Sequence, residues 1–294
     1  MYGLEAVILD GTTLTGCKGF SLDQREKRTT QGADGTLHQT FHNVQRKAPK
    51  VDFSTLAAKQ LLSVLTTSLD VPMKNIGTAV DFNFSRQDDT KPGKNATGHV
   101  GSRFTKGHVY CSGFKWSPGG DGLEASCELF GLSSNGTTDP ITDITPTLVS
   151  PTSAESFTLT SLTVGGVAVT KCQAYDLSIA HQGENNDESL CYNLGLPMPT
   201  MMKVAGAGGQ IAIGGSIELL DQSISPATSG TIVAVFTQTA FGGTLGSATV
   251  TLTINAAMIR EDTKTAQQGS PGIRRFAFMG RHDGTNRPLT WATT

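Results

Sequence analysis

The chain is poor in charge, in aromatic side chains and in long apolar runs. Of its 294 residues only 16% are charged and 6% are aromatic, and the formal net charge is -2. No overall basic field therefore draws the chain to nucleic acid. The longest apolar stretch, TIVAVF at 231–236, has the length of a strand and falls far short of the ~20 residues that span a bilayer. These deficits argue against a nucleic-acid-binding protein and against a helical membrane protein.

Paired cysteine motifs are also missing. The five cysteines are odd in number, widely spaced and without a CxxC pair; they are Cys17, Cys111, Cys127, Cys172 and Cys191. Such spacing argues against a zinc site or a disulfide framework and favours reduced, packed thiols. The first residues, MYGLEAVILDG, have neither the basic nor the apolar region of a secretory signal. We therefore expect synthesis in a cytoplasm.

Motifs that carry chemistry are incomplete. The segment VILDGTTLTG resembles the first motif of haloacid-dehalogenase phosphatases, but Ile8 stands where the nucleophilic aspartate belongs. The glycine-rich segment 206–215 lacks the GK[ST] of a phosphate-binding loop. Asp34, His38 and His42 have a spacing that could share a metal on a helix, but their surroundings show little helical periodicity. We predict no catalytic residue, no metal and no cofactor.

The residues that are abundant favour strands and turns. Glycine numbers 34 and threonine is common, which suits pleated sheets and tight turns better than a helical bundle. The segment VILDGTTLTGCKGFSLDQ at 7–24 aligns without a gap with LTVGGVAVTKCQAYDLSI at 162–179. The identical positions are Gly11 and Gly166, Thr15 and Thr170, Cys17 and Cys172, and Leu22 and Leu177. Each copy predicts a strand, a tight turn and a second strand.

A second pair of similar segments follows in the same order. Residues 107–132 and 230–256 each predict a β-hairpin with a Gly-Gly loop. Between the copies, residues 133–156 are rich in Pro, Ser and Thr, which is typical of a linker. We therefore predict a mainly β protein with two tandem domains of the β-sandwich or barrel type, related by internal duplication. The first spans 1–135, the linker 136–156, and the second, with a C-terminal arm, 157–294.

Each domain is expected to carry one flanking α-helix. Residues 54–69 (STLAAKQLLSVLTTSL) place Ala and Leu on one stripe at helical spacing, with polar residues opposite. The stripe is expected to pack on its own sheet. A shorter equivalent is predicted at 216–222 (SIELLDQ) in the second copy.

Basic residues gather in two segments, 23–50 and 271–294. They include Arg25, Lys27, Arg28, Arg46, Lys47, Arg274, Arg275, Arg281 and Arg287. Residues 184–188 (ENNDE) are acidic, and between 204 and 258 the charged residues are Glu218 and Asp221. Basic arms and acidic faces on one chain suit head-to-tail self-association. A set of solvated loops is the plainer alternative.

These features resemble the major tail tube protein of long, non-contractile-tailed bacteriophages, in its tandem-domain form. The resemblance rests on LEAVILDGTTLTGCKGFSLDQ at 4–24, GADGT at 32–36 and APKVDFSTLAAKQLL at 48–62. The repeated opening at 159–184, LTSLTVGGVAVTKCQAYDLSIAHQGE, has the same form. The resemblance covers nearly the whole chain as architecture, although the family has no diagnostic motif.

The resemblance implies a structural protein of the virion and no enzyme. Its chains would close into trimeric, pseudo-hexameric rings whose inner strands form one barrel. The rings would stack into a tube that conducts DNA without binding it specifically or inserting into a membrane. Its partners would be further copies of itself and the tape measure, terminator and distal tail proteins. The basic residues named above would contact neighbouring subunits and rings, and Glu218 and Asp221 are candidates for the lumen, where a basic surface would bind phosphate.

Two alternatives stay open. One is another phage structural protein, such as a distal tail, connector or capsid decoration protein. The other is a carbohydrate-acting β-sandwich module, although two Trp and four Tyr make a poor stacking platform for sugars.

Overall fold

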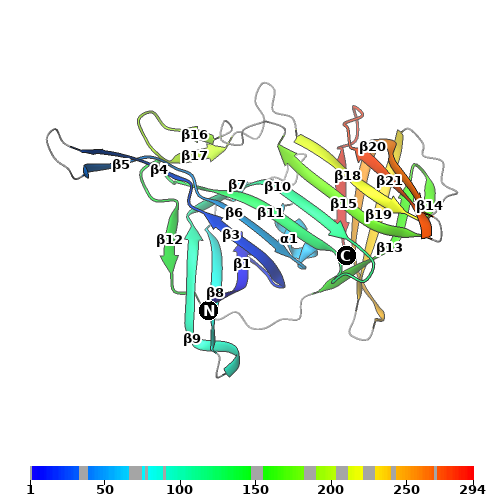
Figure 1. Ribbon diagram of the computed structural model, residues 1–294, viewed down its shortest axis with the longest axis horizontal. Coiled ribbons are helices and arrows are strands. Elements are labelled where there is room, and N and C mark those ends of the chain that lie inside the picture. Colours follow the sequence, from blue (N-terminus) through cyan, green and yellow to red (C-terminus); the bar gives the residue numbers. More distant parts are fainter. Residues whose placement is uncertain are drawn as a thin grey trace.

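The protein is mainly β, as the composition predicts. A computed structural model describes residues 2–32, 39–65, 75–76, 79–88, 91–146, 155–181, 190–202, 211–220, 229–239, 243–267 and 270–294. Within these ranges the chain forms two antiparallel sheets, two separate hairpins and one helix (Figure 1).

The smaller sheet has five strands in the order β12, β9, β8, β1, β2. Their bounds are β1 Tyr2–Leu9, β2 Thr12–Leu14, β8 Val80–Asp88, β9 Lys91–Phe104 and β12 Ile141–Ile144. The turn between β1 and β2 has positive φ at Asp10 (48°) and Gly11 (76°), as a two-residue type I′ hairpin turn requires. The predicted strand-turn-strand opening is therefore confirmed.

The larger sheet has 13 strands. Its main path runs β14, β13, β19, β20, β21, β18, β15, β10, β11, β6, β3, with β22 paired to β20 and β7 to β10. The first-numbered bounds are β3 Cys17–Asp23, β6 Lys50–Thr55, β7 Asn75–Ile76, β10 Lys106–Trp116, β11 Glu124–Leu132 and β13 Ser156–Val164. The others are β14 Val167–Val169, β15 Cys172–His181, β18 Ile211–Leu219, β19 Ser229–Thr239, β20 Leu245–Gln267, β21 Ser270–Met279 and β22 Leu289–Thr293.

Two hairpins stand apart from the sheets. One consists of β4 (Glu26–Gly32) and β5 (Gln39–Lys47), and it projects from the molecule beyond β3 (Figure 1). The other consists of β16 (Leu190–Tyr192) and β17 (Pro199–Met202). Each hairpin lies in the chain between two neighbouring strands of the larger sheet, the first between β3 and β6 and the second between β15 and β18.

The main hydrophobic core of the described chain extends through both halves, and a smaller cluster lies around Phe130. The buried residues form a cluster that runs from Val7 in β1 to Leu289 in β22, without a break between the first half (β1–β12) and the second half (β13–β22). Strands of the larger sheet turn alternate residues into this core, as Val51 and Phe53 of β6 show. The half-buried thiols of Cys17 and Cys172 pack against the same cluster.

The helix α1 (Ala58–Leu65) covers part of this core. Its buried residues include Ala58, Leu61, Leu62 and Leu65 at helical spacing, as predicted. The helix begins later than the predicted residue 54, because Lys50–Thr55 pairs as β6 with β11. The Thr55 hydroxyl oxygen accepts the N–H of Ala57 at 3.0 Å and so caps the entry to the helix.

Truncation of the buried helix stripe is expected to destabilise the fold. Leu61→Ala should lower the free energy of unfolding by about 2–5 kcal/mol, since it opens a cavity where the native side chain is 0% exposed. Ser63→Ala, on the exposed side of the same helix, should change it by less than ~0.5 kcal/mol. Urea unfolding monitored by Trp fluorescence measures both; equal effects would contradict the assignment of the packed face.

The second predicted helix is wrong. Residues 216–219 form the end of β18, between β15 and β21, and Ile213, Ile217 and Leu219 are buried at even spacing. Their period of two is that of a strand. Residues 221 and 222 lie outside the described residues, and α1 is the helix that the described ranges contain.

Both predicted hairpins are confirmed as β10–β11 and β19–β20, but they occupy different places in the strand order. In the predicted linker, residues 141–144 form β12 and pair with β9. Residues 147–154 lie outside the described ranges.

Candidate assembly surfaces

Strands β10 and β15 join the two halves into one continuous sheet. They pair in antiparallel register from Cys111 opposite Ala180 to Trp116 opposite Tyr175. An ion pair between Lys115 Nζ and Asp176 Oδ2, at 3.5 Å, crosses this joint. As a result, eight strands from β3 to β20 lie in one uninterrupted path.

The ends of this eight-strand path are open edges within the described chain. β3 pairs on one side only, with β6, and β20 from Arg260 onward pairs on one side only, with β21. The other strands of the two sheets that pair on one side only, β2, β7, β12, β14 and β22, have two to five residues each. Short edge strands resist pairing with other chains, whereas long unpaired ones invite it. The two long edges are therefore the candidates for contact with another copy.

The face of the eight-strand path that points away from the core is polar and mixed in charge. We call it the open face. Its acidic members include Asp52, Glu124, Glu128, Asp176 and Glu218, and its basic members include Lys50, Lys115 and Arg275. Several of these charges are matched locally, since Lys50 Nζ lies 2.6 Å from Glu128 and 3.3 Å from Asp52.

Burial shapes the protonation of this cluster. Burial alone would raise the pKa of Glu128, but hydrogen bonds from Lys50 and Tyr110 outweigh it and hold the pKa below its ordinary value. Burial raises the pKa of Asp52, and the nearby Lys50 charge offsets only part of this. Burial also raises the pKa of the neighbouring Cys111 thiol to about 11, so the thiol is protonated and unreactive at neutral pH.

Of the two predicted lumen residues, Glu218 and Asp221, the structure describes Glu218. Glu218 lies on the open face, directly opposite Arg275 in the pairing of β18 with β21. Asp221 lies outside the described residues.

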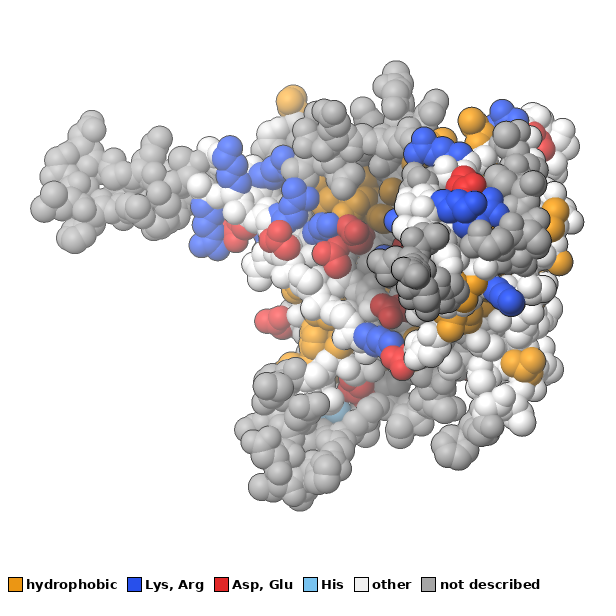
Figure 2. Space-filling model, turned by 45° about the vertical axis from the view of Figure 1, so that its right-hand side comes forward, with side chains coloured by type: hydrophobic (Ala, Val, Ile, Leu, Met, Phe, Trp, Pro, Cys, Tyr) orange, Lys and Arg blue, Asp and Glu red, His pale blue; other side chains and the backbone are white. Residues whose placement is uncertain are grey.

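The predicted basic residues of the first segment gather around the base of the β4–β5 hairpin, and Figure 2 shows their side chains there beside acidic ones. Arg25 lies over the ring of Phe130, with 5.5 Å from its guanidinium carbon to the ring centroid. Lys27 and Arg28 are exposed, and Arg28 pairs with Glu26 at 2.9 Å. Both cations therefore lie at the surface, and Arg28 is held beside Glu26 of its own strand.

Arg46 and Lys47 make contacts within the chain. Arg46 stacks on Tyr192 at 5.0 Å to the ring centroid and donates a hydrogen bond to its hydroxyl. Lys47 is 8% exposed and pairs with Asp139 at 2.5 Å. Both contacts tie the base of the β4–β5 hairpin to other parts of its own chain.

The predicted basic residues of the C-terminal segment divide by exposure. Arg274 is buried, and it makes a bidentate pair with Glu261 at 3.0 and 3.1 Å. Arg275, Arg281 and Arg287 are exposed. The guanidinium of Arg274 is thus paired within its own chain and buried, whereas the other three arginines lie at the surface.

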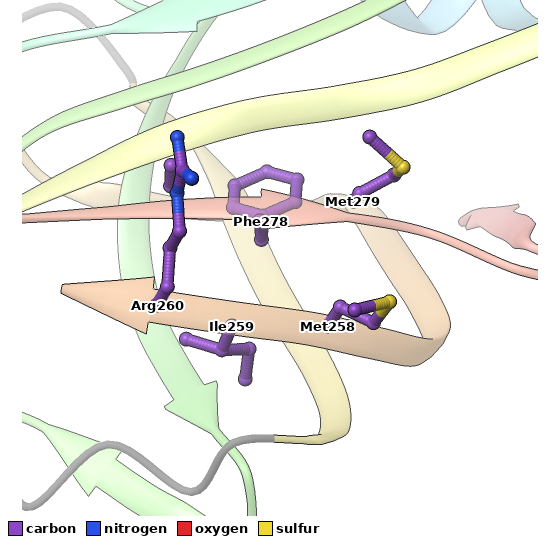
Figure 3. Close-up of a pocket in the computed structure, with 6 residues that line it drawn as sticks. Met258, Ile259, Arg260, Phe278 and Met279 are labelled. Carbon is purple, nitrogen blue, oxygen red and sulfur yellow. The ribbon is translucent and has the colours of Figure 1, made fainter. Parts of the chain in front are cut away.

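Sequence reasoning missed an apolar pocket on β20 and β21 (Figure 3). It has a volume of about 450 Å³ and is lined by Met258, Ile259, Arg260, Ala277, Phe278 and Met279. Met258 and Met279 lie directly opposite each other and are 53% and 54% exposed. Two adjacent exposed methionines are unusual on a solvent-facing surface and are typical of adaptable binding surfaces.

Asp283 holds the turn that follows β21. Its Oδ1 accepts the N–H groups of Thr285 and Asn286 at 2.8 and 2.6 Å. The backbone and side-chain donors of Asn286, then the Thr285 backbone, lower the pKa of Asp283 to about 2. Because the folded pKa lies below the ordinary 3.8, the stabilisation is complete above that value and is lost as the pH falls toward 2.

The titration of Asp283 can be measured by NMR. We expect its side-chain carboxyl resonance to have a midpoint near 2, as the hydrogen bonds require. A midpoint near 3.8 would show that the turn is open in solution. An Asp283→Asn variant is the control, since Asn135 holds the same kind of turn after β11 with an amide that does not titrate.

Comparison with known proteins adds no relative. No protein-family model matches the sequence, and no curated protein matches it closely enough to be counted as similar. Within the described ranges no helix has the length and apolar character needed to cross a membrane.

Proposed function

We propose that this chain is a structural protein that assembles with copies of itself into closed rings, which stack into a tube of the phage-tail type. The observation that carries the proposal is the β10–β15 joint. It joins the sheets of the two halves within one chain, while β3 and the end of β20 leave matching edges open. A chain built this way can repeat the same joint between copies.

The proposal includes an internal duplication, which the strand orders support. The first half has β2, β1, β8, β9 in one sheet and β10, β11, β6, β3 in the other. The second half has β14, β13, β19, β20 followed by β21, β18, β15, where the long β20 takes the places of both β9 and β10. The predicted repeat places β3 on β15, which agrees with this correspondence.

Hydrogen bonds outside the strand ladders support the same correspondence. Leu56 donates its N–H to Gly16 as Leu220 does to Lys171. Thr105 donates to Pro140 as Asn255 does to Pro288. Such pairs recur at corresponding places because both halves follow the same backbone path, and this favours the two-domain organisation predicted from the sequence.

The correspondence gives the register of a joint between copies. In the β10–β15 joint Lys115 lies opposite Asp176. Lys115 also pairs with Glu124 of β11, and Thr265 of β20 pairs with Ile273 of β21, which corresponds to Glu124, so Thr265 corresponds to Lys115. In the repeat of the opening segment, Ser21 of β3 corresponds to Asp176 of β15. Thr265 of one chain would lie opposite Ser21 of the next. Each chain contributes two four-strand units to the path, β3, β6, β11, β10 and β15, β18, β21, β20, so three chains would supply six units and close the ring.

The open face would then line the ring. Its basic side chains are largely offset by acidic neighbours, as in the Lys50–Glu128 and Lys115–Asp176 pairs. Such a surface would let DNA pass without strong phosphate binding, which needs uncompensated cations. Glu218 and Arg275, which lie opposite each other on the open face, are candidates for this surface, whereas the exposed Lys27, Arg28, Arg281 and Arg287 are candidates for contacts between subunits and rings.

Electron microscopy of the purified chain tests the proposed function. Trimeric rings with pseudo-sixfold symmetry, stacked into tubes, are the expected result. Single closed rings without stacking would favour a connector or decoration protein instead. Monomers over a wide range of concentration and salt would contradict both.

A further inference from the structure

The apolar pocket on β20 and β21 has a matched counterpart in the first half of the chain. We propose that this pocket and the turn after β21 form the docking site for the β4–β5 hairpin of a second copy. This inference rests on the ring proposed above and adds which element of one chain covers which surface of the next.

The two surfaces correspond residue by residue. FGLSSNGTTDPIT at 130–142 aligns with MGRHDGTNRPLT at 279–290, with one residue fewer in the second. Phe130 thus corresponds to Met279. The glycine after each donates its N–H to a neighbouring segment, Gly131 to Pro49 just before β6 at 2.8 Å and Gly280 to Ile213 of β18 at 2.9 Å.

In the first half this surface is covered. Phe130 is 0% exposed, and it packs with Tyr110 and Leu132 against Leu190 and Met202 of the β16–β17 hairpin. The hairpin is also tied down by hydrogen bonds, since the carbonyls of Pro197 and Pro199 accept the N–H groups of Lys47 and Ser133 at 3.0 and 2.8 Å.

The turn after β11 is covered by the same hairpin. A Cβ added to Gly136 would come within 2.7 Å of a Leu196 methyl group. The corresponding turn of the second half has the same backbone form, with φ of 93° at Gly284 against 88° at Gly136. No described residue lies within 4 Å of a Cβ added to Gly284, and Met279 is 54% exposed. We call the surface formed by Phe130 or Met279 and the turn that follows it the platform. It is present twice, and the described part of the chain covers it once.

The element that would cover the second platform follows from chain order. The β16–β17 hairpin lies between β15 and β18, and the β4–β5 hairpin lies between the corresponding strands β3 and β6. Because β15 pairs with β10, its hairpin reaches the platform of the half that contains β10. By the same geometry, a β3 strand paired with β20 of another copy would bring β4–β5 over Met258 and Met279.

The direction of the β4–β5 hairpin agrees with this arrangement. In Figure 1 it extends beyond β3 and away from strands β13, β14, β18, β19, β20 and β21 of its own chain. That is the side on which the β20 edge of a neighbouring copy would lie. The single occupant that satisfies both chain order and direction is the β4–β5 hairpin of the adjacent subunit.

Site-specific photo-cross-linking tests this contact. A chain with p-benzoylphenylalanine in place of Met279 is assembled, irradiated and digested, and the joined peptides are identified by mass spectrometry. We expect cross-links to residues 26–47 of another chain. The control places the same group at Leu245, which is 59% exposed at the other end of β20, and should not reach that segment.

A second measurement uses charge. Met258→Asp and Met279→Asp are expected to abolish assembly while leaving the circular dichroism of the monomer unchanged, since both side chains are already exposed. Leu245→Asp should assemble normally. Rings whose cross-links join Met279 to other segments, or rings that form unchanged with both aspartates, would overturn the docking and leave the proposed function standing. An unmodified chain that stays monomeric and gives no interchain cross-link would overturn both.

Discussion

Oxidation of a Ser21→Cys/Thr265→Cys double variant is expected to join the chains covalently into a closed trimer. The β10–β15 joint places Lys115 opposite Asp176, and in the proposed ring the corresponding positions of adjacent copies would be Thr265 and Ser21. Directly opposed residues of antiparallel strands have Cα atoms about 4.5–5.5 Å apart, which a disulfide can span. Non-reducing electrophoresis should show dimers and trimers, with no species beyond the trimer.

The largest covalently joined species on the gel shows how many chains close the ring. Within one chain the two positions lie at opposite ends of the eight-strand path, so the disulfide forms only between copies. A Ser21→Cys/Leu245→Cys variant is the matched control, because Leu245 is exposed on β20 but remote from the unpaired edge. A ladder that ends at six, or one without an end, would contradict the trimeric ring. Absence of any cross-link in assembled rings would contradict the register.

Local features of the fold could be predicted from the sequence. The turns at Asp10-Gly11 and Gly165-Gly166 need backbone conformations that glycine and aspartate tolerate, so the flanking strands could be recognised from short windows. The Ala and Leu stripe of α1 was long enough to define a helical period. The segment 216–222 is too short to define a helical period, and the adjacent Leu219 and Leu220 are compatible with a helix. Only with Ile213 and Ile217 included does the period of two that is typical of a strand become visible.

The contacts between the halves could not be predicted. The β10–β15 joint pairs residues 59 to 69 positions apart, from Trp116 with Tyr175 to Cys111 with Ala180, through backbone groups that leave no pattern in the side chains. In the proposed correspondence of the halves, β20 runs as one strand of 23 residues through the places that β9 and β10 hold in the first half, so 107–132 would not correspond to 230–256. The similarity of 130–142 to 279–290 is readable in the sequence and favours this correspondence.

The basic residues show why charge alone is a weak guide to a binding surface. Arg274 and Arg275 are adjacent in the sequence, yet one is buried in a bidentate pair with Glu261 and the other is exposed on the open face. Strand alternation separates them, since neighbouring side chains point to opposite faces of a sheet. An assembly surface is therefore better defined by its unpaired edges and uncovered apolar side chains than by its cationic residues.

Substitution of Gly122 should destabilise the chain far more than substitution of Gly119 in the same loop. Both glycines have positive φ, 114° and 75°, so an alanine at either strains the backbone by roughly 1–2 kcal/mol. At Gly119 an added Cβ meets nothing within 4 Å. At Gly122 it meets the Ser156 hydroxyl and lies 3.0 and 3.1 Å from the backbone O and N of Phe157.

The difference arises because the β10–β11 loop is part of the contact between the halves. Leu123 donates its N–H to Phe157 at 2.7 Å, and Ser156 donates its hydroxyl to Asp121 at 2.7 Å. Since the backbone of Phe157 is fixed by pairing with β19, it cannot move aside without loss of those bonds. We expect Gly122→Ala to lower the free energy of unfolding by about 2–5 kcal/mol and Gly119→Ala by about 1–2 kcal/mol. Urea unfolding of the two variants measures the difference between their free energies of unfolding. Equal losses would mean that β13 does not lie against this loop in solution. The two halves would then lack the packing that a rigid ring subunit needs.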